Sequence, residues 1–273
     1  MKSPNRIEKK FQDLKTAKKC GFIAYITAGD PHLNATPGLV ATLEKSGVDI
    51  VELGVPFSDP LADGATIQAA ASRAIDAGAS VAGVLESIRV IRKTSEIPIV
   101  LFTYLNPVYT YGFERFHQDA SAAGADGILI LDLPPDEAAR NEELMKSHGL
   151  LSIRLIAPTT PPERMELIAK SAEGFIYYVS REGVTGEQTS LSTSISSQVA
   201  EIRKHTTLPI AVGFGISTPE QAAQVASESD AVVVGSAIVR RIGDHGQDSS
   251  LNEKIAEFVS PISAAIKRSF LST

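Results

Sequence analysis

Short runs of apolar residues, each followed by a helical pattern, recur along almost the whole chain. Several runs are apolar at nearly every position, for example Ile128-Leu129-Ile130-Leu131 and Ala231-Val232-Val233-Val234. Such runs are typical of strands buried on both faces, as in a parallel sheet. We therefore predict eight strands, over Phe22–Thr27, Asp49–Gly54, Ile99–Tyr104, Gly127–Asp132, Ser152–Ile156, Gly174–Val179, Ile210–Gly213 and Ala231–Val234.

The segments between these runs carry helical patterns, and several of them end in glycine. Gly47, Gly124 and Gly149 each stand just before a predicted strand, where glycine fits the position that follows a helix C-terminus. The predicted helices span Gly38–Lys45, Ile67–Ala77, Val81–Thr94, Phe113–Ala123, Pro135–Ser147, Pro161–Lys170, Ser197–Lys204 and Pro219–Ser227, with a terminal helix over Leu251–Leu271.

About eight strand–helix units without a linker favour an α/β fold, a closed (β/α)8 TIM barrel, in one domain over residues 1–273. A doubly wound open sheet is the alternative. Two helices are additional to the barrel. One is an N-terminal helix within Met1–Lys19 that carries Ile7, Phe11 and Leu14 on one face. The other is a short helix after the eighth strand.

Composition excludes several classes of protein. The net charge of -6 offers no excess of positive charge for nucleic-acid binding. No apolar run reaches the roughly 18 residues of a membrane span, and the N-terminus lacks a signal-peptide pattern. The single Cys20 indicates a reducing compartment, and the five histidines show no metal-ligand spacing. We expect a cytoplasmic protein that binds no nucleic acid, no membrane and no metal.

Carboxylates gather where the second strand ends. Glu52 lies near the end of that strand, and the polar loop after it carries Asp59 and Asp63. In barrel enzymes this is the catalytic face, and a carboxyl in an apolar pocket there holds a proton near neutral pH. The structural alternatives are a salt-bridged Glu52, a turn cap at Asp59 and a helix-dipole partner at Asp63. Spacing alone does not decide between the two aspartates.

Glycine-rich loops follow the seventh and eighth strands. The first is Gly213-Phe214-Gly215-Ile216-Ser217, and the second is Gly235-Ser236-Ala237-Ile238-Val239, which opens a short helix. In TIM barrels these two loops bind phosphate through backbone N–H groups, and glycine lets the backbone approach the anion. We therefore predict a phosphorylated ligand.

Aromatic residues and a long polar segment surround these candidates. Tyr25, Phe102, Tyr104, Tyr177 and Phe214 lie at or near strand ends, where they line an aromatic-accepting pocket or simply pack in the core. The residues 181–196 after the sixth strand lack a helical pattern. This segment is interpreted as a mobile lid, or alternatively as a plain connector.

Over nearly its whole length the chain resembles the alpha subunit of tryptophan synthase. The stretch Glu52-Leu53-Gly54-Val55-Pro56-Phe57-Ser58-Asp59-Pro60-Leu61-Ala62-Asp63-Gly64 is the most specific match. The other matching stretches, in order, are Tyr25-Ile26-Thr27-Ala28-Gly29-Asp30-Pro31, Tyr104-Leu105-Asn106-Pro107, Asp132-Leu133-Pro134, Ile156-Ala157-Pro158-Thr159-Thr160, Ser180-Arg181-Glu182-Gly183-Val184-Thr185-Gly186, Gly213-Phe214-Gly215-Ile216-Ser217 and Gly235-Ser236-Ala237-Ile238-Val239.

The resemblance implies a lyase that cleaves indole-3-glycerol phosphate to indole and glyceraldehyde 3-phosphate by a retro-aldol reaction. It places Glu52 and Asp63 at the family's two catalytic positions. It further implies that substrate is bound by Tyr25, Thr27, Phe102, Tyr177, Thr185 and Phe214, and phosphate by Gly186, Gly215, Gly235 and Ser236.

The resemblance also implies a role in tryptophan biosynthesis within a larger assembly. The family's alpha subunit docks on a PLP-dependent beta subunit in an allosteric alpha2beta2 heterotetramer, and indole passes between the two. No cofactor is expected on this chain. Two alternatives stay open, a non-catalytic activator subunit and another phosphate-binding barrel enzyme.

Overall fold

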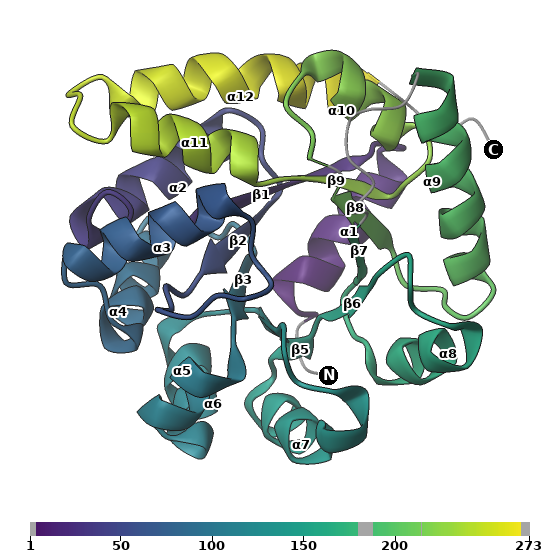
Figure 1. Cartoon of the computed structure of the whole chain (residues 1–273), viewed down its shortest axis with the longest axis horizontal. Helices are drawn as coiled ribbons and strands as arrows, with labels where there is room; N and C mark the ends of the chain where they lie inside the picture. Colours follow the sequence, from purple (N-terminus) through teal and green to yellow (C-terminus); the bar gives the residue numbers. More distant parts are fainter. Residues whose placement is uncertain (1–3, 180–187, 214, 269–273) are drawn as a thin grey trace.

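Parallel strands form one continuous sheet that closes into a barrel, with helices around it (Figure 1). The computed structural model describes residues 4–179, 188–213 and 215–268. Its strands are β1 (Gly21–Thr27), β2 (Ile50–Gly54), β3 (Ile99–Thr103), β4 (Gly127–Ile130), β5 (Leu151–Ser152), β6 (Arg154–Ile156), β7 (Ile176–Val179), β8 (Ile210–Gly213) and β9 (Ala231–Val234).

The pairing of the strands closes the ring. β1 pairs in parallel with both β2 and β9. β4 pairs with β5 and β6 pairs with β7, while Ile153 alone separates β5 from β6. The two ends of the sheet therefore meet, which excludes the doubly wound open sheet. The short strands β5 and β6 together are the fifth strand of the barrel. The prediction of one unbroken strand over Ser152–Ile156 was therefore wrong, although the predicted (β/α)8 class is confirmed.

Twelve α-helices and two short 3-10 helices occupy the described ranges. They are α1 (Arg6–Thr16), η1 (Leu33–Ala35), α2 (Thr36–Lys45), α3 (Ala65–Asp76), α4 (Val81–Arg92), α5 (Leu105–Tyr111), α6 (Phe113–Ala123), η2 (Pro135–Glu137), α7 (Ala139–His148), α8 (Pro162–Ser171), α9 (Gln188–Arg203), α10 (Pro219–Ala226), α11 (Ser236–His245) and α12 (Leu251–Arg268). Within the described part of the chain, no helix is long and apolar enough to cross a membrane.

Three helical predictions need correction. The segment interpreted as a polar lid over 181–196 is helical from Gln188 onward, as the start of α9, and its residues 181–187 lie outside the described ranges. The helix predicted over Pro135–Ser147 divides into η2 and α7. Helix α5 was not predicted, because Asn106-Pro107 resembles a turn.

Helix α1 lies across one end of the barrel (Figure 1). Asn5 starts it, because its side chain accepts the Ile7 N–H at 2.9 Å while Glu8 Oε2 accepts the Asn5 N–H at 3.1 Å. Ile7, Phe11 and Leu14 are buried together with the inward side chains of the strands, as predicted. The larger core lies between the strands and the outer helices. The barrel interior is therefore packed at this end, and the opposite end holds the site.

At the α1 end, acidic residues bridge pairs of neighbouring strands. They connect the first, third, fifth and seventh strands of the barrel, which are β1, β3, β5 and β8, each to the strand that follows it in the barrel. Asp49, Asp126 and Asp230 directly precede β2, β4 and β9, and Glu173 precedes β7. Each exchanges two hydrogen bonds with one residue of the strand before it. The backbone N–H of the acid donates to that residue's carbonyl, and the acid's carboxylate accepts that residue's N–H. The four partners are Phe22, Ile99, Ile210 and Ser152, and the bonds measure 2.8–3.2 Å.

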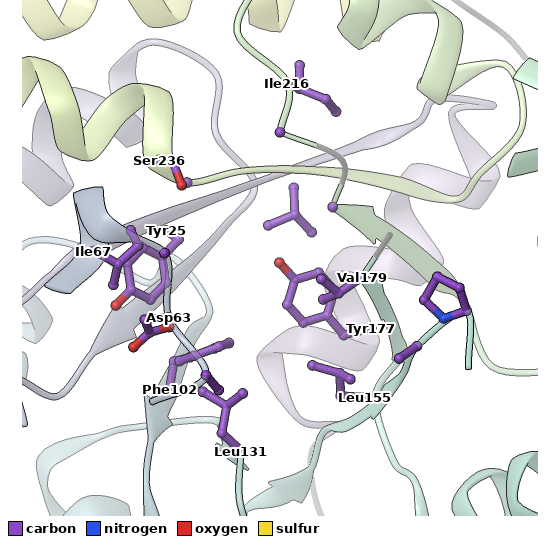
Figure 2. A pocket seen from close by; sticks show the side chains of 18 of the residues that line it. Tyr25, Asp63, Ile67, Phe102, Leu131, Leu155, Tyr177, Val179, Ile216 and Ser236 are labelled. Atoms are coloured by element: carbon purple, nitrogen blue, oxygen red, sulfur yellow. The ribbon is translucent and has the colours of Figure 1, made fainter. Parts of the chain in front are cut away.

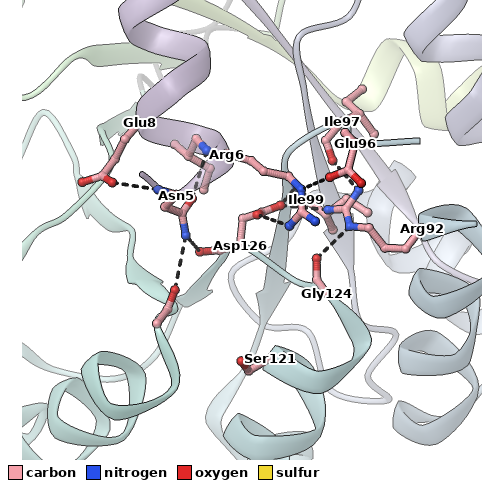
Figure 3. Close-up of polar contacts among 12 residues, drawn as sticks. Asn5, Arg6, Glu8, Arg92, Glu96, Ile97, Ile99, Ser121, Gly124 and Asp126 are labelled. Carbon is pink, nitrogen blue, oxygen red and sulfur yellow. Dashed lines mark hydrogen bonds and ion pairs between the residues drawn. The ribbon is translucent and has the colours of Figure 1, made fainter. Parts of the chain in front are cut away.

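Basic side chains from helices join three of these acids. Asp126 lies between Arg6 of α1 at 3.0 Å and Arg92 of α4 at 2.8 Å (Figure 3). Lys267 pairs with Asp49, and Arg203 pairs with Asp230 at 2.9 Å. The ion pairs thus connect α1, α4, α9 and α12 to the starts of the strands.

Candidate active site

A cavity of about 800 Å³ opens at the carboxyl ends of the strands (Figure 2). This is the face on which TIM-barrel enzymes carry their active sites. It is lined by Tyr25, Ala62, Asp63, Gly64, Ile67, Phe102, Leu131, Leu155, Ala157, Pro158, Thr159, Tyr177, Val179, Gly213, Gly215, Ile216, Val233, Gly235 and Ser236. Most of these side chains are apolar or aromatic, and Asp63 is the one ionisable carboxyl in the set.

Glu52 lies on β2 and is fully buried, so it does not itself line the cavity but lies next to Tyr25, which does. It pairs in register with Tyr25 of β1, and when Glu52 is ionised its charge raises the pKa of the Tyr25 and Tyr177 hydroxyls. Among the described residues, neither carboxylate oxygen of Glu52 has a hydrogen-bond partner. Burial without a compensating partner raises the pKa of Glu52 to about 8. Glu52 therefore holds a proton at neutral pH.

Asp63 lies in the loop between β2 and α3 and is partly exposed to the cavity. Its Oδ2 accepts a hydrogen bond from the Tyr104 hydroxyl at 3.1 Å. Burial raises the pKa of Asp63, and the hydrogen bond from Tyr104 opposes that rise. Asp59, in contrast, is exposed and accepts a hydrogen bond from Ser58 Oγ at 2.5 Å. Of the two aspartates in this loop, Asp63 is the one that faces the cavity.

Three aromatic rings form the inner wall. Phe102 contacts Tyr25 edge to face at a centroid distance of 5.2 Å, and contacts Tyr177 at 6.5 Å. Glycines make room for both tyrosines. A β-carbon at Gly54 would lie 2.2 Å from the Tyr25 hydroxyl, and one at Gly213 would lie 2.7 Å from the Tyr177 hydroxyl. Gly213 was predicted within a phosphate loop, yet its close neighbour is this aromatic wall.

Another part of the cavity is built from backbone. Gly235 precedes α11, which begins at Ser236, so the first N–H groups of that helix lie beside the cavity (Figure 2). Gly215 has a φ of 63°, a left-handed conformation that favours glycine. A helix N-terminus with nearby glycine backbone is a site for an anion. The two predicted phosphate loops thus meet at one end of one cavity.

The structure brings together most of the predicted site residues. Thr27 is buried at the end of β1 and does not line the cavity. Thr185, Gly186 and Phe214 lie outside the described residues. Among the described residues, no group of three His, Cys, Asp or Glu side chains could hold a metal ion.

Sequence reasoning missed several residues of the wall. Leu155 and the segment 157–159 come from the fifth barrel strand and the loop after it. The rule that barrel sites use every strand-to-helix loop would have included them. Tyr104 was named as a pocket candidate, but its hydrogen bond to Asp63 joins residues 41 positions apart, and no local pattern indicates it.

Comparisons with known proteins agree on one family. The family model for the tryptophan synthase alpha chain matches residues 11–267. The chain is 49% identical to the tryptophan synthase alpha chain of Geobacter sulfurreducens, over 96% of this chain and 99% of that one. It is 50% identical to that of Solibacter usitatus, over 93% and 95%. The structure superimposes on tryptophan synthase subunit alpha from Legionella pneumophila with a TM-score of 0.90 and 41% identity, covering 97% and 99% of the two chains.

Proposed function

The chain belongs to the family of tryptophan synthase alpha chains, and we propose that Glu52 is the general acid and Asp63 the electrostatic partner of its lyase reaction. That reaction cleaves indole-3-glycerol phosphate to indole and glyceraldehyde 3-phosphate. The observation that carries the proposal is the difference between the two carboxyls. One is buried without a partner and the other is hydrogen-bonded at the cavity wall.

Glu52 begins the reaction by donating its proton to C3 of the indole ring. Its pKa of about 8 keeps the proton available near pH 7. Protonated at C3, the ring becomes an electron sink with positive charge at its nitrogen. The bond from C3 to the glycerol carbon then breaks, its electrons restore the aromatic ring, and the hydroxyl on that carbon becomes the aldehyde. The hydroxyl proton returns to the Glu52 carboxylate, directly or through water, so the protons balance.

Asp63 stabilises the positive charge at the indole N–H. For this role it must be ionised, and the hydrogen bond from Tyr104 favours the ionised form. The charge develops during the reaction, so the interaction with Asp63 is stronger in the transition state than with bound substrate.

The rest of the cavity orients the substrate. The aromatic wall of Tyr25, Phe102 and Tyr177 holds the indole ring, and the N-terminus of α11 with Gly215 and Gly235 binds the phosphate. Ser236 adds a hydroxyl at the same end of the cavity. Thr27, Thr185, Gly186 and Phe214 complete the proposed substrate and phosphate sites by their place in the family motifs.

We further propose that the chain works in the cytoplasm with a PLP-dependent beta subunit, in an alpha2beta2 heterotetramer that receives the indole. Two apolar side chains that are unusually exposed support a docking face. Leu61, in the loop that carries Asp63, is 92% exposed, and Tyr109 on α5 is 74% exposed. Covering them with a partner removes apolar surface from water. PLP belongs to the partner, and this chain supplies no part of its chemistry.

Conversion of indole-3-glycerol phosphate to indole by the purified chain tests the proposal. We expect slow indole formation by the chain alone and faster formation with a beta subunit. Asp63→Asn should abolish it, while the matched control Asp59→Asn, in the same loop but exposed, should leave it within about twofold. Equal activity of the two variants would overturn the role of Asp63. Stimulation of the beta subunit by a chain that forms no indole would identify an activator subunit instead.

A further inference from the structure

An ion pair behind the cavity joins the loop after β1 to helix α3. Arg73 of α3 binds Asp30 with two parallel hydrogen bonds, Nε to Oδ1 at 2.9 Å and Nη2 to Oδ2 at 2.8 Å. The Asp30 side chain is 1% exposed, and that of Arg73 is 39% exposed. A bidentate pair fixes the orientation of both groups, which a single contact does not. The mechanism proposed above gives neither residue a role.

Helix α11 contacts the same two elements. A β-carbon at Gly243 would lie 2.7 Å from Arg73 Nη2, and one at Gly246 would lie 2.9 Å from Pro31, next to Asp30. Gly243 thus lets the guanidinium lie against α11, and Gly246 lets the loop after β1 do the same. The ion pair is therefore a junction of three elements.

Closer to the cavity, the same elements are joined by apolar contacts. Tyr25, Ile67, Ala70 and Val239 form one small buried cluster, with Phe102 packed against it. These residues come from β1, α3, α11 and β3. Arg73 and Gly243 lie about one helical turn further along their helices, at Ala70 plus three and Val239 plus four. Helices α3 and α11 lie side by side (Figure 1), and both the cluster and the Arg73 guanidinium lie where the two helices meet.

The two helices joined here begin at the two ends of the proposed substrate site. α3 starts two residues after Asp63, and α11 starts at Ser236, beside the phosphate end. The spacing of these helices therefore sets the spacing between the carboxylate and the anion site. A ligand that reaches both ends depends on that spacing, whereas one that occupies a single end does not.

We propose that Arg73 is a positioning residue, whose pair with Asp30 and contact with Gly243 hold α3 and α11 at the separation that indole-3-glycerol phosphate spans. The inference rests on the proposed function for the identity of the spanning substrate.

The test compares a ligand for one end with a ligand for both. Inorganic phosphate probes the α11 end, and indolepropanol phosphate carries indole and phosphate on one chain. Calorimetry would measure both affinities for the native chain, Arg73→Met, Arg73→Lys and Gly243→Ala, and kinetics would give kcat and KM for indole-3-glycerol phosphate. Arg89→Met is the matched control. Arg89 lies on α4, pairs with the exposed Glu86 and is 42% exposed, a fraction similar to the 39% of Arg73.

In Arg73→Met we expect phosphate affinity within about twofold of the native value, but loss of about tenfold in affinity for indolepropanol phosphate and in kcat/KM. Arg73→Lys should recover part of the loss, and Gly243→Ala, which displaces Arg73 without removing it, should act in the same direction. Arg89→Met should change neither affinity. Equal weakening of both ligands by Arg73→Met, or weakening of neither, would overturn the inference. Absence of cleavage by the native chain would contradict the proposed function instead, and the binding comparison would still test Arg73.

Discussion

The Tyr104 hydroxyl connects two parts of the loop that bears Asp63. It donates to Asp63 Oδ2 at 3.1 Å and accepts the backbone N–H of Ala62 at 3.1 Å. The Tyr104 ring also packs against Phe57, at a centroid distance of 5.4 Å. Tyr104 therefore holds both the Asp63 carboxylate and the neighbouring backbone of the same loop against the end of β3.

Tyr104→Phe should shift the acid side of the pH–rate profile to higher pH. The hydrogen bond from Tyr104 stabilises the ionised carboxylate, so without it the pKa of Asp63 rises further. As the pH is lowered, the rate should then begin to fall at a higher pH than in the native chain. We also expect kcat to fall several-fold at neutral pH and stability to fall by about 1 kcal/mol. Tyr111→Phe is the matched control, because it removes a hydroxyl–carboxylate hydrogen bond, to Asp119 at 2.7 Å, outside the cavity. An unchanged profile would show that Tyr104 does not set the ionisation of Asp63.

The rate of cleavage should depend on pH as a bell-shaped curve. Glu52 must be protonated, so the rate falls as pH rises through its pKa of about 8. Asp63 must be ionised, so the rate falls as pH drops through its pKa, which burial raises above the ordinary aspartate value. Measurement of kcat/KM across this range would report both groups in the free enzyme. A rate that keeps rising beyond the pKa of Glu52 would exclude Glu52 as the general acid.

Glu52→Gln should be more stable than the native chain at alkaline pH. The unfolded chain releases the Glu52 proton at the ordinary glutamate pKa, whereas the folded chain keeps it up to about pH 8. Native stability therefore falls as pH rises between these two values and is level above them. Glutamine does not titrate. The free energy of unfolding of the variant, relative to that of the native chain, should therefore rise by on the order of 3 kcal/mol between about pH 5 and about pH 8. Urea unfolding at both pH values measures this difference.

A matched surface variant separates burial from loss of charge. Glu86→Gln removes a glutamate whose side chain is 61% exposed, and a surface substitution of this kind should change stability by no more than about 0.5 kcal/mol at either pH. Parallel behaviour of the two variants would mean that Glu52 is ionised in the folded chain.

Gly213→Ala should disturb the aromatic wall. The added methyl would lie 2.7 Å from the Tyr177 hydroxyl and 2.9 Å from its ring, so the ring must move. We expect KM for indole-3-glycerol phosphate to rise about tenfold, since a moved ring no longer fits the indole. Gly38→Ala is the control, because Gly38 lies on α2 outside the cavity lining and its would-be β-carbon meets only Asn252 Nδ2, at 3.5 Å. The same KM in both variants would show that the position of the Tyr177 ring does not affect substrate binding.

The barrel could be predicted because its strands are short and apolar throughout. In runs such as Ala231–Val234 every residue is apolar, and every residue is buried because the strand is covered on both faces. Helix α9 was predicted too short because Gln188–Ser196 is rich in serine and threonine, which have low helix propensity and offer no apolar stripe. Helix α5 has Asn106-Pro107 in its first turn, where proline is compatible with a helix although it reads as a break.

The candidate site was predictable where the fold repeats a general rule. Glu52 and the loops after β8 and β9 lie at barrel positions that carry catalysis and phosphate binding. Contacts between units were not predictable. The pairs Tyr104 with Asp63, Arg73 with Asp30, and Gly213 with Tyr177 each join two neighbouring strand–helix units. Their meeting depends on the pairing of strands in the sheet rather than on any local pattern.

The acidic bridges at the α1 end divide the barrel into four tandem modules of two strands each. The carboxylates of Asp49, Asp126, Glu173 and Asp230 each tie the second strand of a module to its first, and none of these four carboxylate–amide bonds joins one module to the next. The connections between modules, which precede β3, β5 and β8, are therefore natural places to open the chain. A circular permutant opened there keeps every carboxylate bridge within one module.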